Sequence, residues 1–449
     1  MSIEEKALEF AIKAHQGQVR KSEPDKPMIF HPINVGQILK ENGFDENVVA
    51  AGYLHDVVED TKYTFDDIKN EFGDDIASLV YGASEPDKSL SWEDRKKHTI
   101  ETVKDLDVRH KAVVCADKIS NLEDLYFLIG KTVGSTGKFD FSCFKRGFFD
   151  QQWYYTSVLE SLGDNEEIKS MVKKYDDLLQ KIFYNADIDI YLRNVVFDDD
   201  AERYTKLQKL HHKKQELLKL KTLSKDMKPY VIEFTGTPRT GKTTLINNLE
   251  DFFKKGGFKT SILEEFTTSK KYKKEIYPHL KDQYKNIINT EIPKHVLKQL
   301  TDEIDKNPDI IIIDRSLLDR LIWADRLWIK NGFTNEEYDN YKKEYIPLIK
   351  KYIDVIIGTY TDSVTAIKRD YKANLALEER HFLNTQNVDE YNESFNNVKE
   401  ITEQEKIDFY KFDTTNKKQE DINIEVANTI LDDAREEYIK RLKKEYKIK

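Results

Sequence analysis

The pattern of apolar residues changes character near residue 225, and this change constrains the fold more than any other feature of the sequence. Before about residue 185, apolar residues recur every three or four positions, as in EEKALEFAIKAH (4–15), which is typical of amphipathic helices. Later, short β-rich runs such as YVIEFTG (230–236) and DIIIID (309–314) alternate with longer helical segments. Buried parallel strands that alternate with helices produce this second pattern. The sequence therefore predicts an all-α domain followed by an α/β domain with a parallel sheet.

We expect three parts along the chain. Residues 1–185 form the helical domain, residues 186–228 a helical basic connector, and residues 229–449 the α/β domain. Within the connector, residues 201–228 contain nine Lys or Arg against three Asp or Glu, with leucines spaced along one face. One interpretation is a connecting helix with a solvated basic side. The other is a basic surface that faces a phosphate-rich ligand or an acidic partner.

The composition limits the classes of function. The chain has 449 residues and a net charge of −10, which disfavours a general nucleic-acid-binding or membrane-binding protein. Its two cysteines, Cys115 and Cys143, are too few for a disulfide framework or a zinc site. The N-terminal sequence lacks the regions of a signal peptide, and no apolar run approaches the ~20 residues that span a bilayer. We therefore expect a reduced, cytoplasmic protein, and the sequence leaves its oligomeric state open.

The segment GTPRTGKT (236–243) fits the pattern G-x-x-x-x-G-K-[ST] of a phosphate-binding P-loop. It follows a strand-like run and precedes an amphipathic helix, as the pattern requires. Glycines let the backbone turn tightly and direct N–H groups at phosphate oxygens, and the helix N-terminus adds partial positive charge. Lys242 would reach the β- and γ-phosphates, and Thr243 would bind Mg²⁺. The residues predicted to bind ATP are Gly236, Arg239, Thr240, Gly241, Lys242, Thr243 and Thr244.

A second strand-like run ends in Asp314 and Arg315, and an acid at that place can hold Mg²⁺ through water or orient a nucleophile. With these motifs, residues 229–440 resemble the nucleoside and nucleotide kinases of the thymidylate-kinase and deoxynucleoside-kinase type. The resemblance implies phosphoryl transfer from ATP to a nucleoside or nucleotide, and it leaves the acceptor open. The catalytic side chains that it implies are Glu264 or Glu265 beside the acceptor hydroxyl, Asp314, Arg315, and the lid arginines Arg369 and Arg380.

In the first half, the stretch GYLHDVVEDT (52–61) places four ionisable side chains beside apolar ones. His55 and Glu59 are four residues apart, as are Asp56 and Asp60, so each pair lies on nearby faces of a helix. So many ionisable groups beside a core are costly unless something binds them. Histidine and aspartate together offer ligands to one divalent metal ion, so the stretch indicates a metal site.

Two more potential ligands stand in apolar segments, His31 in MIFHPI and Asp117 in AVVCADKISNL. Either residue alone would more often be a satisfied core residue or a helix cap. A histidine, an adjacent His-Asp pair and a later aspartate together resemble the metal ligands of the HD phosphohydrolase superfamily. The Glu-Asp pair that follows is similar to that of the RelA/SpoT-type alarmone hydrolase branch, and the resemblance extends over about residues 1–160.

This resemblance implies an activity and a set of roles. His31, His55, Asp56 and Asp117 would bind the metal, usually Mn²⁺ in this branch, and Glu59 and Asp60 would orient or deprotonate the attacking water. Arg20, Lys21 and Asn121 would line the nucleotide site. The implied reaction releases pyrophosphate from the 3′ side of a guanosine tetra- or pentaphosphate, (p)ppGpp.

The sequence departs from that branch at several points, and the P-loop domain stands where the family has a synthetase domain. The turn after Lys21 is longer than the family's usual one, and Lys118 stands where the family has an arginine. We therefore keep (p)ppGpp or a related nucleotide as the expected substrate and expect a bifunctional nucleotide enzyme. Two alternatives remain: a hydrolase regulated by an NTP-binding P-loop domain that is not a kinase, and a nucleotide sensor without catalysis.

Overall fold

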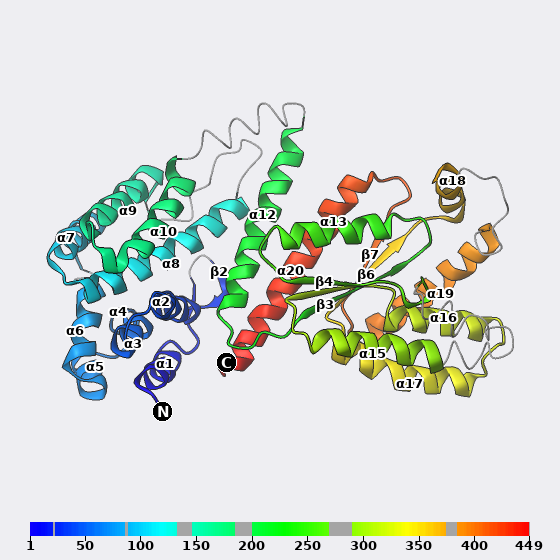
Figure 1. Ribbon diagram of the computed structural model, residues 1–449, viewed down its shortest axis with the longest axis horizontal. Coiled ribbons are helices and arrows are strands. Elements are labelled where there is room, and N and C mark those ends of the chain that lie inside the picture. Colours follow the sequence, from blue (N-terminus) through cyan, green and yellow to red (C-terminus); the bar gives the residue numbers. More distant parts are fainter. Residues whose placement is uncertain are drawn as a thin grey trace. The chain divides into compact units, whose positions relative to one another are not determined.

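The computed structural model describes residues 1–20, 23–85, 89–132, 146–184, 200–268, 290–373 and 384–448. The chain divides into two compact units (Figure 1), one formed by Met1–Lys225 with Glu436–Lys449 and the other by Asp226–Arg435. The first is mostly helical and the second contains a five-stranded parallel sheet, so the predicted fold classes are confirmed. Within the part of the chain that the structure describes, no helix has the length and apolar character needed to cross a membrane.

Helices of the first unit surround a core that α8 shares with α2 and α3. Ile33, Val49 and Ile119, one from each of these helices, are almost completely buried. The helices are α1 (Ile3–Ala14), α2 (Phe30–Glu41), α3 (Glu46–Leu54), α4 (Val57–Asp60), α5 (Phe65–Phe72), α6 (Asp74–Ala83), α7 (Trp92–Asp105), α8 (Val108–Thr132), α9 (Phe148–Leu162), α10 (Lys169–Leu179) and α12 (Ala201–Thr222). Shorter elements are the antiparallel pair β1 (Val19–Arg20) and β2 (Glu23–Pro27), the 3-10 helix η1 (Glu166–Ile168) and the π-helix η2 (Gln180–Tyr184).

The helix that the sequence predicts through residues 52–61 is interrupted at His55 and Asp56. Helix α3 ends at Leu54 and α4 begins at Val57. Both residues of the break keep right-handed helical backbone angles, with φ −57° and ψ −36° at His55 and φ −90° and ψ −7° at Asp56. The Asp56 carboxylate lies 3.2 Å from His55 Nε2, so the two side chains face the same point.

Helix α12, within the predicted basic connector, packs in the first unit. Its apolar side buries Leu210, Leu217 and Leu220, and α12 and α8 lie against each other. The last residues of the chain join the same unit: the Tyr446 hydroxyl donates to the carbonyl of Leu223, 2.5 Å away. Side chains of α12 can therefore contact the other helices of the first unit.

The sheet of the second unit has the strand order β4-β5-β3-β6-β7, with every pair parallel. Its strands are β3 (Tyr230–Gly236), β4 (Thr260–Leu263), β5 (Ile310–Asp314), β6 (Val355–Tyr360) and β7 (Phe409–Asp413). Its helices are α13 (Lys242–Lys254), α15 (Ile292–Ile304), α16 (Leu317–Ile329), α17 (Asn335–Tyr352), α18 (Ser363–Ala373), α19 (Thr385–Gln404) and the 3-10 helix η4 (Phe266–Thr268). Helix α20 (Gln419–Glu445) belongs to this unit as far as Arg435 and to the first unit from Glu436 on. Since β3 is central, the loop at its carboxyl end lies where open parallel sheets bind ligands.

A buried acid fixes the start of α16 against the central strand. Glu233, in β3, accepts hydrogen bonds from the backbone N–H groups of Ser316, Leu318 and Asp319 at 2.8, 3.1 and 3.0 Å. These are N–H groups that the first turn of a helix leaves without intrahelical partners. The contact holds the segment that follows β5 at the same edge of the sheet as the P-loop.

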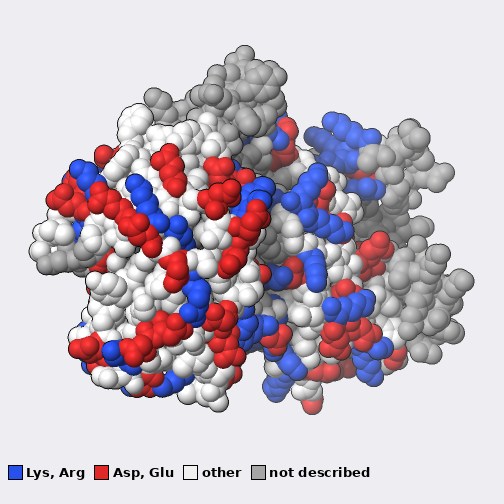
Figure 2. Space-filling model, turned by 60° about the vertical axis from the view of Figure 1, so that its left-hand side comes forward, with Lys and Arg blue, Asp and Glu red and all other residues white. Residues whose placement is uncertain are grey.

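Acidic and basic side chains are interspersed over the face of the molecule shown in Figure 2, and no single sign covers it. This mixture agrees with a chain whose Lys+Arg total of 72 is close to its Asp+Glu total of 82. Charge is therefore organised at individual sites and not over this whole face.

Candidate functional site

Four side chains of the first unit converge on one point. His31 Nε2, from α2, lies 3.2 Å from His55 Nε2 and 3.1 Å from Asp117 Oδ1 on α8. One potential ligand atom from each of these three residues lies within 4.8 Å of the others. Asp56 completes the cluster, with carboxylate oxygens 3.2 Å from His55 Nε2 and 3.5 Å from His31 Nε2. The structure thus brings together all four predicted metal ligands from three separated segments.

Hydrogen bonds orient both imidazole rings toward this point. His55 Nδ1 lies 2.8 Å from the carbonyl oxygen of Gly52, so Nδ1 carries a proton and donates it. His31 Nδ1 lies 2.9 Å from Ser120 Oγ, and a proton on this nitrogen would likewise leave Nε2 unprotonated. Two unprotonated Nε2 atoms at 3.2 Å repel each other unless a cation lies between them. The geometry and the donor set of two imidazoles and two carboxylates fit a divalent metal ion.

Without a metal, protons take part of that charge-balancing role. Burial alone would lower the pKa of His55, but the carboxylates of Asp56 and Asp117 raise it to about 9. Burial, together with the charge of Arg20, lowers the pKa of His31. Without a metal, His55 therefore holds a proton readily and His31 does not. This is expected for two adjacent imidazoles, because a proton on one ring disfavours a proton on the other.

Asp117 has two more partners on its own helix. Asn121 Nδ2 donates to Oδ1 at 2.6 Å, and Lys118 Nζ lies 2.5 Å from Oδ2. Burial would raise the pKa of Asp117, but Lys118 and the two histidines hold it well below its usual range. Asp117 is therefore a carboxylate held in one orientation. The contribution of Lys118 was not predicted from the sequence.

The two acids after the His-Asp pair differ in their surroundings. Glu59 Oε1 accepts a hydrogen bond from the backbone N–H of Glu85 at 2.6 Å. Burial and the neighbouring charge of Asp56 raise the pKa of Glu59 to about 7. Asp60 is exposed. A carboxyl group that titrates near neutrality is suited to proton transfer, so the structure distinguishes Glu59 from Asp60.

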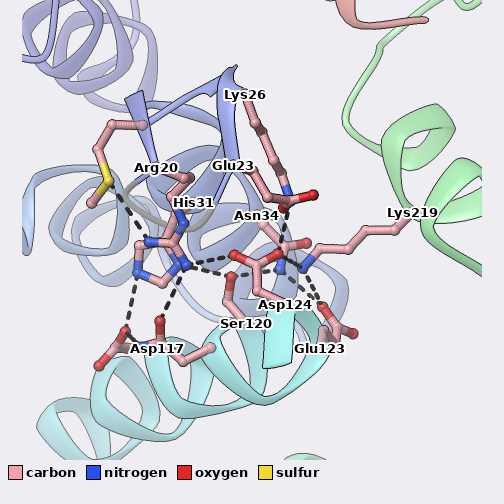
Figure 3. A network of polar contacts seen from close by, with 12 residues as sticks. Arg20, Glu23, Lys26, His31, Asn34, Asp117, Ser120, Glu123, Asp124 and Lys219 are labelled. Atoms are coloured by element: carbon pink, nitrogen blue, oxygen red, sulfur yellow. Dashed lines mark hydrogen bonds and ion pairs between the residues drawn. The ribbon is translucent and has the colours of Figure 1, made fainter. Parts of the chain in front are cut away.

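Of the three predicted nucleotide-binding residues, two lie beside the metal cluster. Arg20 Nη2 lies 2.5 Å from Asp124 Oδ2 (Figure 3). The same nitrogen lies 3.4 Å from Asn121 Oδ1. Asn121 in turn contacts Asp117. Lys21 lies outside the described residues. Asp124, which the sequence reasoning did not single out, is the main partner of Arg20.

In the second unit, the predicted P-loop joins β3 to α13. Gly236 has φ +136°, and a Cβ atom there would lie 1.9 Å from the carbonyl oxygen of Thr359 on the neighbouring strand. Gly241 has φ +84°, in the left-handed region that favours glycine. Thr243 and Thr244 are exposed in the first turn of α13. The loop has the backbone form that leaves this turn open to an anion.

Lys242 of the loop forms an ion pair with Asp314 at the end of β5. Burial and the charge of Arg315 lower the pKa of Lys242, although Asp314 opposes the shift. The two residues predicted to act on the phosphates and on Mg²⁺ are thus brought together. Without a nucleotide, each serves as the other's counter-charge.

Other predicted residues line the P-loop. The Thr240 hydroxyl lies 2.8 Å from that of Thr359, and Arg239 pairs with Asp370 at 2.5 Å. Arg369 donates to the Thr414 hydroxyl at 3.0 Å and to its carbonyl oxygen at 2.5 Å. In this structure Arg369 therefore connects α18 to the end of β7. Arg380 lies outside the described residues.

The two candidate acids after β4 differ in their surroundings. Glu264 is exposed, whereas Glu265 Oε2 lies 3.5 Å from Arg315 Nε. Arg315 also donates to Asp319 Oδ1 at 2.8 Å. Burial would raise the pKa of Asp319, but Arg315 and Arg320 hold it at about 2. Asp319 was not predicted from the sequence, because Arg315 precedes α16 with a φ of 62° and the contact depends on this turn of the backbone.

The segment that contains the cluster of the first unit is similar to known proteins. The sequence profile described as "HD domain" matches residues 7–128. The guanosine-3′,5′-bis(diphosphate) 3′-pyrophosphohydrolase MESH1 of Xenopus tropicalis is 39% identical over 121 residues, which are 26% of this chain and 67% of that protein. The chain belongs to the HD-domain family. The protein of the same name from Drosophila melanogaster is 41% identical to the HD domain over 120 residues, which cover 26% of this chain and 66% of the fly protein.

After the HD domain, the profile described as "AAA domain" matches residues 231–404, which include the P-loop. A solved structure of deoxyadenosine kinase from M. mycoides with bound dATP is 22% identical in sequence, with a TM-score of 0.32. It covers 45% of this chain and 99% of that chain. The two profile matches show that the chain combines an HD domain with a P-loop-type domain.

Proposed function

We propose that the HD domain is a Mn²⁺-dependent hydrolase of (p)ppGpp or a related nucleotide that releases pyrophosphate from the 3′ position. One observation carries the proposal: two imidazole Nε2 atoms and two carboxylates, from His31, His55, Asp56 and Asp117, meet at one point. The names of the curated relatives supply the substrate class. The products would be pyrophosphate with GDP from ppGpp, or with GTP from pppGpp.

The residues of the chain divide the work of this reaction. His31, His55, Asp56 and Asp117 would hold the metal, which when bound makes water more acidic and offsets phosphate charge. Glu59 takes the proton of the attacking water, because its raised pKa makes it a base near neutral pH. Asp60, which is exposed, would help to orient that water. The residues that would bind the nucleotide are Arg20, Lys21 and Asn121.

We further propose that the P-loop domain transfers a phosphoryl group from ATP·Mg²⁺ to a nucleoside or nucleotide. Lys242 would move from Asp314 to the β- and γ-phosphates, while Asp314 and the Thr243 hydroxyl would hold Mg²⁺. The contact between Glu265 and Arg315 favours Glu265 over the exposed Glu264 as the base. Arg369 and Arg380 remain the proposed lid arginines.

A second candidate function for the P-loop domain is regulation. The same loop would bind ATP or GTP without an acceptor, and NTP binding would then change the activity of the HD domain. Arg369 is engaged in hydrogen bonds with Thr414 and with the carbonyl oxygen of Arg239 in the P-loop, so it lies beside the loop and could respond to a bound NTP in either function. Sensing of nucleotides without catalysis is the weaker form of the same idea.

The hydrolase proposal is tested by product analysis. The full chain is incubated with ppGpp and Mn²⁺, and the products are separated by ion-exchange chromatography. We expect GDP and pyrophosphate in equal amounts, and no turnover when EDTA replaces the metal. GTP, which lacks a 3′ phosphate, is the matched control and should stay intact. Unchanged ppGpp, or hydrolysis of GTP at the same rate, would contradict the proposal.

A further inference from the structure

Lys219 of α12 reaches the HD site from outside the matched family segment, which ends at residue 128. Its side chain is only 10% exposed. Its ammonium nitrogen lies 3.1 Å from Glu123 Oε2 and 3.2 Å from Asp124 Oδ1, both on α8 (Figure 3). A lysine of the predicted basic connector is therefore buried between two adjacent acids of the HD domain.

One chain of contacts leads from Asp124 to the metal cluster. Asp124 Oδ2 accepts from Arg20 at 2.5 Å, and Arg20 lies 3.4 Å from Asn121 Oδ1. Asn121 then donates to Asp117 at 2.6 Å. Arg20 is the member of this chain that would contact the substrate, since it is a cation beside a site for phosphates.

A second chain of contacts leads from Glu123 to the same cluster. Asn34 Nδ2 donates to Glu123 Oε2 at 3.0 Å and to Ser120 Oγ at 2.9 Å. Ser120 Oγ lies 2.9 Å from His31 Nδ1. The two acids bound by Lys219 are thus each connected, through side chains alone, to a different residue of the metal cluster.

The charges show what Lys219 does to Asp124. Burial alone would raise the pKa of Asp124, but Lys219, Lys26 and Arg20 hold it well below its usual range, and Lys219 has the largest effect of the three. Without Lys219, Asp124 would be left with Lys26 and Arg20 as its close cations. Arg20 would then be held more tightly by Asp124 and would be less available to an anionic ligand.

We propose that Lys219 is a positioning residue for the HD site: by neutralising Asp124 and Glu123, it sets how strongly Arg20 is held and therefore how well Arg20 binds substrate phosphate. The inference rests on the proposed hydrolysis of (p)ppGpp. If the inference holds, α12 contributes to the substrate affinity of the HD domain. A helix that served only as a spacer would not affect this affinity.

The test measures steady-state hydrolysis of ppGpp by the full chain carrying Lys219→Met. We expect KM to rise on the order of tenfold, with kcat changed far less, because Arg20 acts on substrate binding. Lys219→Arg, which keeps the charge, should restore most of the affinity. The control is Lys206→Met on the same helix, since Lys206 is half-exposed and pairs with Glu202; it should leave KM unchanged.

A double-mutant cycle separates positioning from a general loss of positive charge. In an Arg20→Met background, Lys219→Met should change KM by much less than it does in the wild type, because the residue through which it acts is gone. Fully additive effects on KM, or an unchanged KM in Lys219→Met, would overturn the inference. Wild-type protein that leaves ppGpp intact would instead remove the proposed function, and the inference with it. If Lys219→Met does not fold, Lys219→Gln carries the same prediction.

Discussion

The HD site and the P-loop solve the same problem, the handling of phosphate groups, with different parts of the chain. The HD cluster consists of side chains from residues 31, 55, 56 and 117, brought together by the packing of separate helices. The P-loop consists mainly of backbone within residues 236–243, shaped by two glycines with positive φ. One site depends on tertiary structure and the other on local conformation.

This difference determines what each site tolerates. In the HD cluster, hydrogen bonds to Gly52 and Ser120 fix the rings, and each carboxylate has a specific partner, so the loss of one side chain leaves buried charges uncompensated. In the P-loop, most donors are backbone N–H groups, which every substitution except one to proline keeps, so we expect the glycines and Lys242 to be the sensitive positions. The comparison predicts large effects of side-chain changes in the first site and of backbone changes in the second.

The largest expected effect is that of Asp56→Ala. It removes a carboxylate that lies 3.2 Å from His55 Nε2, so hydrolysis of ppGpp should fall by more than the roughly 100-fold that changes around metal ligands cost. ATP binding by the P-loop domain, measured by calorimetry, should stay the same. Asp66→Asn, at an exposed position of α5, is the control. Hydrolysis retained in Asp56→Ala would break the comparison.

Lys242→Ala should reduce ATP-dependent phosphoryl transfer roughly 100-fold, because the lysine would stabilise charge on the transferring phosphate. The assay is transfer from labelled ATP to a panel of nucleosides and nucleotides. Exposed Lys255, paired only at the surface with Asp251, gives the control Lys255→Ala. Normal ppGpp hydrolysis in Lys242→Ala would support two independent enzymes, whereas altered hydrolysis would support the regulatory alternative.

Gly236→Ala tests the backbone side of the comparison. A methyl group would meet the carbonyl oxygen of Thr359, which belongs to the sheet and has little room to move. We expect the second unit to lose about 3 kcal/mol of stability from the clash and the positive φ, measured by denaturant unfolding. At Gly147 in the first unit nothing lies within 4 Å, so Gly147→Ala should be nearly neutral. Equal losses of stability in the two variants would contradict the predicted clash at residue 236.

The smallest effect concerns pH. Burial and the charge of Asp56 raise the pKa of Glu59 from 4.5 to about 7, so Glu59 keeps its proton below that pH and becomes a base above it. A nearby metal cation would lower this value, so the acid limb of kcat should lie between 4.5 and about 7, with roughly tenfold loss of rate per pH unit below it. The same limb in Glu59→Gln would show that another group is the base.

The two sites also differed in how far the sequence predicted them. The P-loop and its flanking elements follow from one continuous pattern, so Lys242 and its glycines were assigned from local sequence alone. A metal site at His55 and Asp56 was predicted from the local sequence. The joining of His31 and Asp117 to it as ligands rested on family resemblance, because no local rule brings residues 86 positions apart together. The roles of all these residues stay predictions, while their placement is observed.

Other features depended on tertiary packing and were not predicted. The break between α3 and α4 was missed because residues 52–61 have a continuous helical pattern. The pairing of Lys219 with Asp124, 95 positions apart, depends on how α12 packs against α8. The choice between Glu264 and Glu265 depends on the direction of the chain after β4, which places only Glu265 beside Arg315.

The central claim, that the HD cluster is a metal centre with two histidine ligands, is tested most directly by paramagnetic resonance of bound Mn²⁺ in protein labelled with ¹⁵N-histidine. We predict one saturable Mn²⁺ per chain coupled to two histidine nitrogens, falling to one nitrogen in His55→Gln and unchanged in the surface variant His98→Gln. Absence of saturable binding, or a bound Mn²⁺ without coupling to histidine nitrogen, would contradict the account.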